Sequence, residues 1–262
     1  MPIKESFHEY LNAPFAESLP KEYQAALAAV GTAPLSAASL QEVLDVIAAE
    51  KDHMAFARKG GLFLAAAHQA LRTESSLDLA VLDGARLDCV GAFGKGFSLT
   101  VKGDVGNYAG AYLEAGTLLI EGDAEDYAGA GMKGGTIQIK GLAENHLGHS
   151  MVGGEIVVAR NAHDFIGNAM WGGHIVVQAN AGYSAGYRMM GGVIEVRDLT
   201  WDLAGEEMTG GRVQIGGHIG RDLGLGMAGG ELALSEKNEG AQRAKSSGGK
   251  LVILKKGEKR AG

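Results

Sequence analysis

The feature that most constrains this chain is a 19-residue repeat. No insertion breaks its register between Gly96 and Gly249, and a methionine column runs in step from Met132 to Met227. A repeat of fixed period indicates an array of stacked structural units rather than one irregular core. Glycine is also twice as common as usual, with 42 among 262 residues against the ordinary ~7%. The glycines that define the structural repeat are Gly116, Gly135, Gly154, Gly173, Gly192, Gly211 and Gly230.

The residues after each glycine pair alternate between apolar and polar or small. Ile137 and Ile139 in one unit, and Ile175 and Val177 in another, flank a single intervening residue. This period of two is typical of a strand with one buried face. Nineteen residues are too few for a two-helix repeat, and the leucine-rich repeat pattern is absent. Two or three short strands joined by glycine turns do fit.

The sequence therefore predicts a mainly β fold, a right-handed parallel β-helix of about nine 19-residue coils. Equivalent residues of successive coils stack at the ~4.8 Å strand spacing, and crossovers between parallel strands are generally right-handed. The apolar columns point inward. The glycine columns mark corners where φ is positive or where no room exists for a Cβ atom.

Open ends of a β-helix expose unpaired strand edges, so we expect terminal caps. The first part of the chain has a helical pattern, with an apolar face from Leu19 to Val30, a capping box of Ser39 and Glu42, and an Ala-rich segment over 61–72. The predicted domains are a helical cap or docking region (1–76), the parallel β-helix (77–254) and a basic tail (255–262).

Composition excludes several classes of protein. The formal charge of −7 argues against a general nucleic-acid binder, and one cysteine, Cys89, cannot form an internal disulfide. No apolar run approaches the ~18 residues that span a membrane, and the N-terminus lacks the pattern of a secretory signal. We expect a cytoplasmic protein without nucleic-acid or membrane partners.

Sequence motifs assign no chemistry. A Walker A loop, CxxC, HExxH and GxSxG are all absent. We therefore assign no catalytic residue and no metal ligand, and the cofactor-binding residues are unknown. The methionine column is expected to fill the core, and Trp171 and Trp201 are assigned either to the core or to an interface. Two sets of polar residues could form a metal or cation site, but we favour another role for each. We expect the histidines to be solvated or at an interface: His146, His149, His163 and His174. We expect the second set to form a hydrogen-bonded turn ladder: Asn107, Asp126, Asn145 and Asp164.

Four segments carry a family resemblance: GAGMKGGTIQIKG (129–141), GHSMVGGEIVV (148–158), GNAMWGGHIVV (167–177) and GLGMAGGELAL (224–234). They resemble the Gly-x-x-Met-x-Gly-Gly-x-Ile repeats found in one of the subunits of formylmethanofuran dehydrogenase. The same type of subunit also occurs in the bacterial formyltransferase/hydrolase complex. The segments also resemble the C-terminal GXGXG domain of the glutamate synthase large subunit. The resemblance covers roughly residues 91–254.

This resemblance implies a non-catalytic scaffold subunit of a multi-subunit enzyme complex of one-carbon metabolism. The alternative is a glutamate-synthase-like GXGXG subunit that braces amidotransferase and FMN domains. In either case the chain itself would bind no cofactor, and methanofuran-type carriers, molybdopterin or FMN would lie on other subunits. The expected partners are those subunits, and a homo-oligomer is left open.

Two other classes of function stay open from the sequence. A free-standing enzyme that acts in a groove along the β-helix would need a cluster of Asp, Lys and Arg there, which the sequence does not reveal. The other class is a homo-oligomeric binding module.

Overall fold

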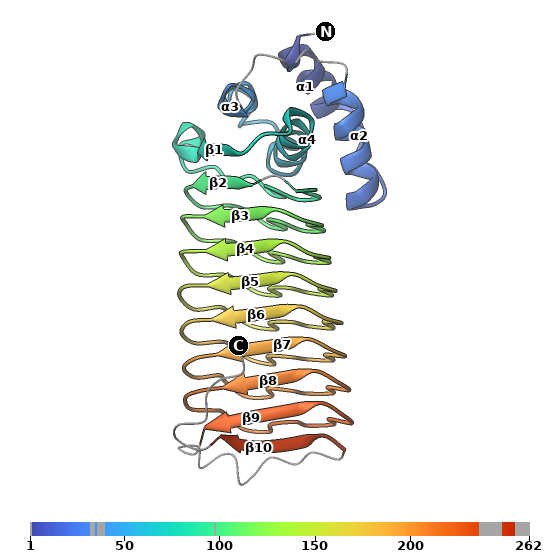
Figure 1. Cartoon of the computed structure of the whole chain (residues 1–262). Coiled ribbons are helices and arrows are strands. Elements are labelled where there is room, and N and C mark those ends of the chain that lie inside the picture. Colours follow the sequence, from blue (N-terminus) through green and yellow to red (C-terminus); the bar gives the residue numbers. More distant parts are fainter. Residues whose placement is uncertain (1, 32–34, 36–39, 97, 236–247, 255–262) are drawn as a thin grey trace.

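A computed structural model describes residues 2–31, 35, 40–96, 98–235 and 248–254. Ten strands form one parallel sheet in chain order, and Figure 1 shows them stacked as a single column. The strands are β1 (Ser75–Asp78), β2 (Leu99–Lys102), β3 (Thr117–Ile120), β4 (Thr136–Ile139), β5 (Glu155–Val158), β6 (His174–Val177), β7 (Val193–Val196), β8 (Arg212–Ile215), β9 (Glu231–Ser235) and β10 (Lys250–Leu254).

The register of this sheet follows the sequence repeat. From β2 onward, each residue pairs with the residue 19 positions later in the next strand. The first such pair is Leu99 with Leu118, and the series continues to Leu232 with Leu251. Eight such turns follow a longer first turn, in which Ser75 of β1 pairs with Leu99 of β2. The predicted parallel β-helix is confirmed.

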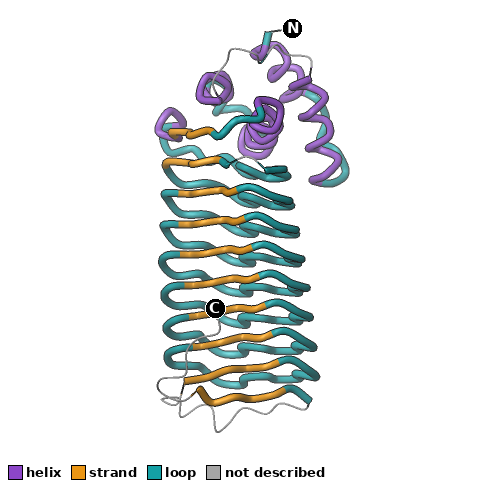
Figure 2. Tube along the Cα trace, viewed as in Figure 1, coloured by secondary structure: helices purple, strands orange, loops and turns teal. Residues whose placement is uncertain are grey.

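Each coil contains one strand rather than the expected two or three. The second contact between coils is a single-residue bridge that runs through Ala124, Ala143, Ala162, Ala181 and Thr200. Tight turns make up the remainder of each coil, as the long loop segments of Figure 2 show. Most residues of this second ladder are small, although it begins at Val105 and ends at Ile219.

The core of the column consists of like residues stacked on like. The inward Ile, Leu and Val side chains of the strands are buried, and so is the methionine column, which confirms its expected role as core filler. The methyl group of each methionine reaches the next coil. A Cβ added at Gly154 would lie 2.6 Å from Met132 Cε, and one added at Gly173 would lie 2.6 Å from Met151 Cε.

The two glycines of each pair serve different purposes. The second one has positive φ throughout the predicted set, for example +93° at Gly173 and +88° at Gly192. The first one faces the backbone of the coil before it, since a Cβ at Gly153 would lie 2.6 Å from the Lys133 carbonyl oxygen. Both expected reasons for glycine are thus present, at adjacent positions.

A column of non-glycine residues in left-handed conformation was not anticipated from the sequence. Tyr108, Tyr127, His146 and Phe165 all have φ between +61° and +63°. Such a conformation costs about 1–2 kcal/mol per residue for an L-amino acid. Their rings stack face to face along the column, with centroids 4.9, 4.6 and 5.0 Å apart. The same left-handed conformation continues in this column at Ser184, Leu203 and Asp222, so it does not depend on ring stacking.

Four helices cover the first end of the column (Figure 1): α1 (Ile3–Asn12), α2 (Leu19–Gly31), α3 (Leu40–Ala48) and α4 (Gly61–Leu71). A π-helical turn (Phe56–Gly60) leads into α4, and a 3-10 turn (Leu79–Leu82) follows β1. The predicted apolar face of α2 is present, with Tyr23, Ala26 and Val30 buried. Ser39 of the proposed capping box lies outside the described residues.

A buried ion pair holds the helical cap together. Lys59 and Glu22 are both almost inaccessible, with Nζ and Oε1 3.7 Å apart. Lys59 Nζ also donates to the carbonyl oxygens of Tyr10 (2.9 Å) and Ala13 (2.5 Å). One cation therefore ties α1, α2 and the π-helical turn together.

The cap joins the column through both backbone and rings. The Asp88 amide of the first coil donates to the Ala57 carbonyl (3.0 Å). Tyr23 of α2 stacks on Phe93 at 4.4 Å, and Phe93 stacks on Tyr112 at 5.0 Å, so a ring ladder crosses the junction. Burial raises the pKa of Tyr23 to about 12, so its phenol stays neutral there.

The far end of the column returns to register as expected. Leu251 and Ile253 of β10 pair with Leu232 and Leu234. The predicted basic tail (255–262) and most of the polar segment before Gly248 lie outside the described residues. Within the described part of the chain, no helix has the length and apolar character needed to cross a membrane.

Candidate functional site

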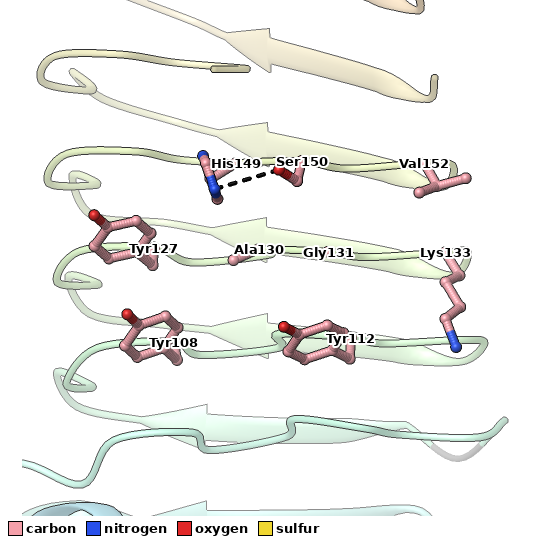
Figure 3. A pocket seen from close by; sticks show the side chains of 9 residues that line it. All are labelled: Tyr108, Tyr112, Tyr127, Ala130, Gly131, Lys133, His149, Ser150 and Val152. Atoms are coloured by element: carbon pink, nitrogen blue, oxygen red, sulfur yellow. Dashed lines mark hydrogen bonds between the residues drawn. The ribbon is translucent and has the colours of Figure 1, made fainter. Parts of the chain in front are cut away.

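A shallow groove of about 600 Å³ lies on the outside of the second to fourth coils. Its floor consists of the small residues Ala130, Gly131 and Ser150, of which Gly131 and Ser150 occupy the same position in successive coils. Figure 3 shows Tyr108 and Tyr127 stacked on one side of this floor and Lys133 and Val152 on the other. The lining is completed by Tyr112 and His149.

One pair of groove residues resembles a nucleophile beside a base. Ser150 Oγ lies 3.3 Å from His149 Nε2, drawn as a dashed line in Figure 3. Burial lowers the pKa of His149, with a smaller contribution from His146, so the imidazole is neutral at pH 7. Its buried Nδ1 has no hydrogen-bond partner among the described residues. A catalytic histidine needs a third group to orient it, so this pair is not a complete triad.

The lysine of the groove is committed to a structural contact. Lys133 Nζ lies 3.1 Å from Glu114 Oε1, and Lys95 approaches the same carboxylate, so three successive coils share one ion-pair ladder. Hydrogen bonding from Lys133 lowers the pKa of Glu114. Burial raises the pKa of Tyr108. The raised pKa keeps the phenol of Tyr108 neutral, so this hydroxyl is not activated as a nucleophile.

An exposed apolar stripe continues from the groove along the column. Val152, Trp171 and Met190 occupy equivalent positions of three successive coils and are 57%, 62% and 36% exposed. Trp201 is 54% exposed and packs against Tyr183, with ring centroids 5.5 Å apart, at a second position of the coil. Both tryptophans therefore lie on the surface, so the core role considered for them is wrong. Exposed tryptophans are typical of protein interfaces.

The candidate histidines fall into two groups. His163 and His174 are partly exposed and pair with carboxylates: His163 with Glu144 at 2.5 Å, and His174 with Glu195 at 3.4 Å. His146 was expected to be solvated or at an interface, and the structure places it elsewhere. It lies within the ring ladder, between Tyr127 and Phe165, because its coil position is the one that all the stacked aromatic residues share.

The polar column of Asn107, Asp126, Asn145 and Asp164 has a structural role. Each side-chain Oδ1 accepts a hydrogen bond from the backbone amide one coil later. Asp126 accepts from Asn145 (2.9 Å), Asn145 from Asp164 (3.2 Å) and Asp164 from Tyr183 (2.8 Å). The predicted turn ladder is confirmed. A second ladder, which sequence reasoning missed, runs from Asp104 to Asp123 and from Asp123 to Leu142.

Among the residues that the structure describes, neither metal binding nor thiol chemistry has a suitable arrangement of side chains. In the described part of the chain, no three His, Cys, Asp or Glu side chains lie close enough together to hold a metal ion. Cys89 is buried, and burial raises the pKa of its thiol, so the reactive thiolate is disfavoured.

The ladders of glycine, methionine and apolar residues match one known protein family. The family model described as GXGXG motif covers residues 90–259, well over half of the chain. A comparison with curated proteins finds no match. The chain belongs to the GXGXG motif family.

Proposed function

We propose that this chain is a non-catalytic scaffold subunit of a multi-subunit enzyme complex of one-carbon metabolism, of the formylmethanofuran dehydrogenase or formyltransferase/hydrolase type. The supporting observation is the regularity of the column. Every coil is hydrogen-bonded in register to the next, so outward side chains of different coils stay at fixed separations. Such a column positions partner subunits without taking part in their chemistry.

The state of the reactive groups supports the same proposal. His149 lacks an orienting partner among the described residues, Cys89 is buried, and Lys59 is enclosed within the helical cap. The exposed tryptophans, in contrast, lie where a partner can reach them. Cofactors such as methanofuran-type carriers, molybdopterin or FMN would belong to the other subunits.

A glutamate-synthase-like role is the second candidate, because the repeats resemble both branches of the superfamily. In that case the partners would carry amidotransferase and FMN domains. The two candidates differ in what should co-purify. A formyl-transferring complex carries formyl transfer or hydrolysis activity, whereas a glutamate-synthase-like complex carries bound FMN and glutamine-dependent activity.

The test is to isolate the tagged full chain from its native source and to assay four reactions: formyl hydrolysis, formyl transfer, glutaminase and glutamate synthase. We expect activity in the assembled complex and none in the purified chain. The variant Ser150→Ala removes the hydroxyl that contacts His149 in the groove, and we expect the activity of the complex to be unchanged. Turnover by the isolated chain that Ser150→Ala abolishes would overturn the scaffold role.

A further inference from the structure

Two ladders of stacked rings run side by side along the solenoid, and one of them stops at the groove. The longer ladder, from Tyr108 to Phe165, passes the groove without a break. The shorter ladder starts at Tyr23 of the cap, continues through Phe93 and ends at Tyr112, with successive ring planes tilted by only 8° and 11°. Its last ring, that of Tyr112, lines the groove.

The shorter ladder ends because the next two positions of its column carry no ring. Gly131 and Ser150 stand one and two periods after Tyr112. One face of the Tyr112 ring stacks on Phe93, and no second ring of the described residues stacks on the other face. Two coil spacings of ~4.8 Å separate Tyr112 from Ser150, which is the room that one more stacked ring takes. We call this space beside Gly131 the empty ring position.

The backbone at the empty ring position has the same conformation as in the ladder itself. The φ angle is +59° at Phe93, +58° at Tyr112 and +62° at Gly131. A Cβ added at Gly131 would lie 2.8 Å from Tyr112 Cε1, so the tyrosine ring lies directly beside the space that a side chain would enter. Only the side chain is missing, and a ring from outside that takes its place meets the ring of Tyr112.

The surroundings of the empty ring position suit a neutral planar group. Figure 3 shows Tyr127 on one side and Lys133 and Val152 on the other. His149 stands edge-on to Tyr127, with the two ring planes at 90°. Lys133, the charged residue of the lining, is paired with Glu114 at 3.1 Å. A volume of about 600 Å³ and a largely aromatic lining with few polar groups are typical of small-molecule sites.

We propose that the groove binds a small molecule through a neutral planar aromatic ring, which stacks on Tyr112 and takes the empty ring position. The proposal goes beyond the scaffold function and does not rest on it. It assigns to the outside of the solenoid a ligand site that needs no catalytic group.

The first test compares phenol with cyclohexanol, which has the same ring size and hydroxyl group but is neither aromatic nor planar. Each is titrated into the full chain, and the amide signals of Gly131 and Ser150 are followed by nuclear magnetic resonance. We expect saturable binding of phenol in the low millimolar range, as for other ligands of this size. Phenol should bind about five-fold more tightly than cyclohexanol, because stacking adds to the burial of apolar area. Equal affinities, or no saturation below about 30 mM phenol, would overturn the proposal.

The second test changes the site. Gly131→Tyr supplies the missing ring from the chain itself, and we expect this variant to fold, as Phe93 and Tyr112 do at the same φ, and to lose phenol binding. Tyr112→Leu should lower the affinity for phenol to that for cyclohexanol. Tyr183→Leu is the matched control, because this half-exposed tyrosine packs against Trp201 at another position of the coil, and it should leave binding unchanged.

The outcome with the variants decides where the ring binds. Phenol binding that survives both Gly131→Tyr and Tyr112→Leu would place the ligand elsewhere and overturn the proposal. Amide signals of Gly131 and Ser150 that respond to a partner protein but not to phenol would also overturn it, and would assign the empty ring position to a side chain of that partner.

Discussion

In the solenoid each side chain contacts its own equivalent one coil away, whereas the helical cap is built from contacts between unlike residues. Tyr127 stacks on His146, and Ile156 pairs with Ile175, because both members of each pair are 19 residues apart. In the cap, Lys59 of the π-helical turn meets Glu22 of α2. A repeated contact is visible as a column in the sequence, and a unique contact is not.

This difference has a consequence for stability. The solenoid distributes its stability over many similar layers, as repeat proteins do, so each layer depends on its neighbours. The cap depends on a few contacts that each occur only once. Both tryptophans lie in the solenoid and the helices lie before it, so tryptophan fluorescence reports the solenoid and helical circular dichroism reports the cap.

The largest effect is expected from a charge in the solenoid core. Ile156→Asp places an unpaired carboxylate among buried apolar side chains, which costs several kcal/mol and should prevent folding of the neighbouring coils. Ala159→Asp, three residues later at an exposed position of the same coil, is the control and should fold normally. Equal melting temperatures for the two variants, measured by fluorescence, would show that the inward column is misassigned.

A smaller and more local effect is expected in the cap. Lys59→Met leaves the Glu22 carboxylate buried without its partner, and removal of one member of such a pair typically costs about 3–5 kcal/mol. Helical circular dichroism should be lost at a lower temperature, while the fluorescence transition of the solenoid moves little. The double variant Lys59→Met/Glu22→Leu should recover most of the loss. A failure of that recovery would mean that the hydrogen bonds of Lys59, and not the charge pair, hold the cap.

A third prediction separates backbone strain from steric clash at glycine. Gly173→Ala introduces a Cβ at φ +93° and 2.6 Å from Met151 Cε, whereas Gly84→Ala introduces one at φ +84° into open space. Positive φ alone costs about 1–2 kcal/mol, so Gly84→Ala should lose that much and Gly173→Ala should lose more. Denaturant titration of both variants measures the difference. Equal losses would remove the steric part of the explanation.

The smallest effect is expected from pH. Burial lowers the pKa of His149 in the solenoid and of His68 in the cap below the ordinary 6.5. A lowered histidine pKa means that the unfolded state binds the proton more readily, so stability falls as the pH drops below about 6.5. Both regions should therefore melt earlier at pH 5.5 than at pH 7.5. His149→Gln should reduce the shift seen by fluorescence, and His68→Gln the shift seen by circular dichroism. A pH response that survives both substitutions would assign it to other groups.

The sequence was sufficient to predict the columns but not all of their conformations. The Gly-Gly corners, the methionine core and the Asn/Asp ladder follow from residue type, since each has one dominant physical reason at its position. Tyr127 and Phe165 gave no such indication, because an aromatic residue in left-handed conformation is unusual by itself. Their spacing at the 19-residue period was a usable signal. The aromatic ladder becomes visible only when the column is read as a whole.

The cap and the groove were harder to predict for a different reason. Lysine is almost never fully buried without a partner, so nothing in the local sequence marks Lys59 as a core residue. Tyr112, Gly131 and Ser150 occupy the same position in three successive coils. The groove forms where the large tyrosine is followed by two small residues, and this difference in size matters only once the coils are stacked. The capping box at Ser39 stays a prediction.

The central claim is that the 19-residue period alone sets the register of the column, and deletion of one coil tests it most directly. Removal of residues 136–154 takes out one full period and joins Gly135 to Glu155, so the next strand takes the place of the missing one. Removal of residues 136–153 takes out one residue fewer and turns inward side chains outward. We expect the first deletion to fold into a column shorter by about 4.8 Å, measured by crystallography, with a cooperative melting transition. The second should not fold. A well-folded 18-residue deletion, or an unfolded 19-residue deletion, would contradict the account.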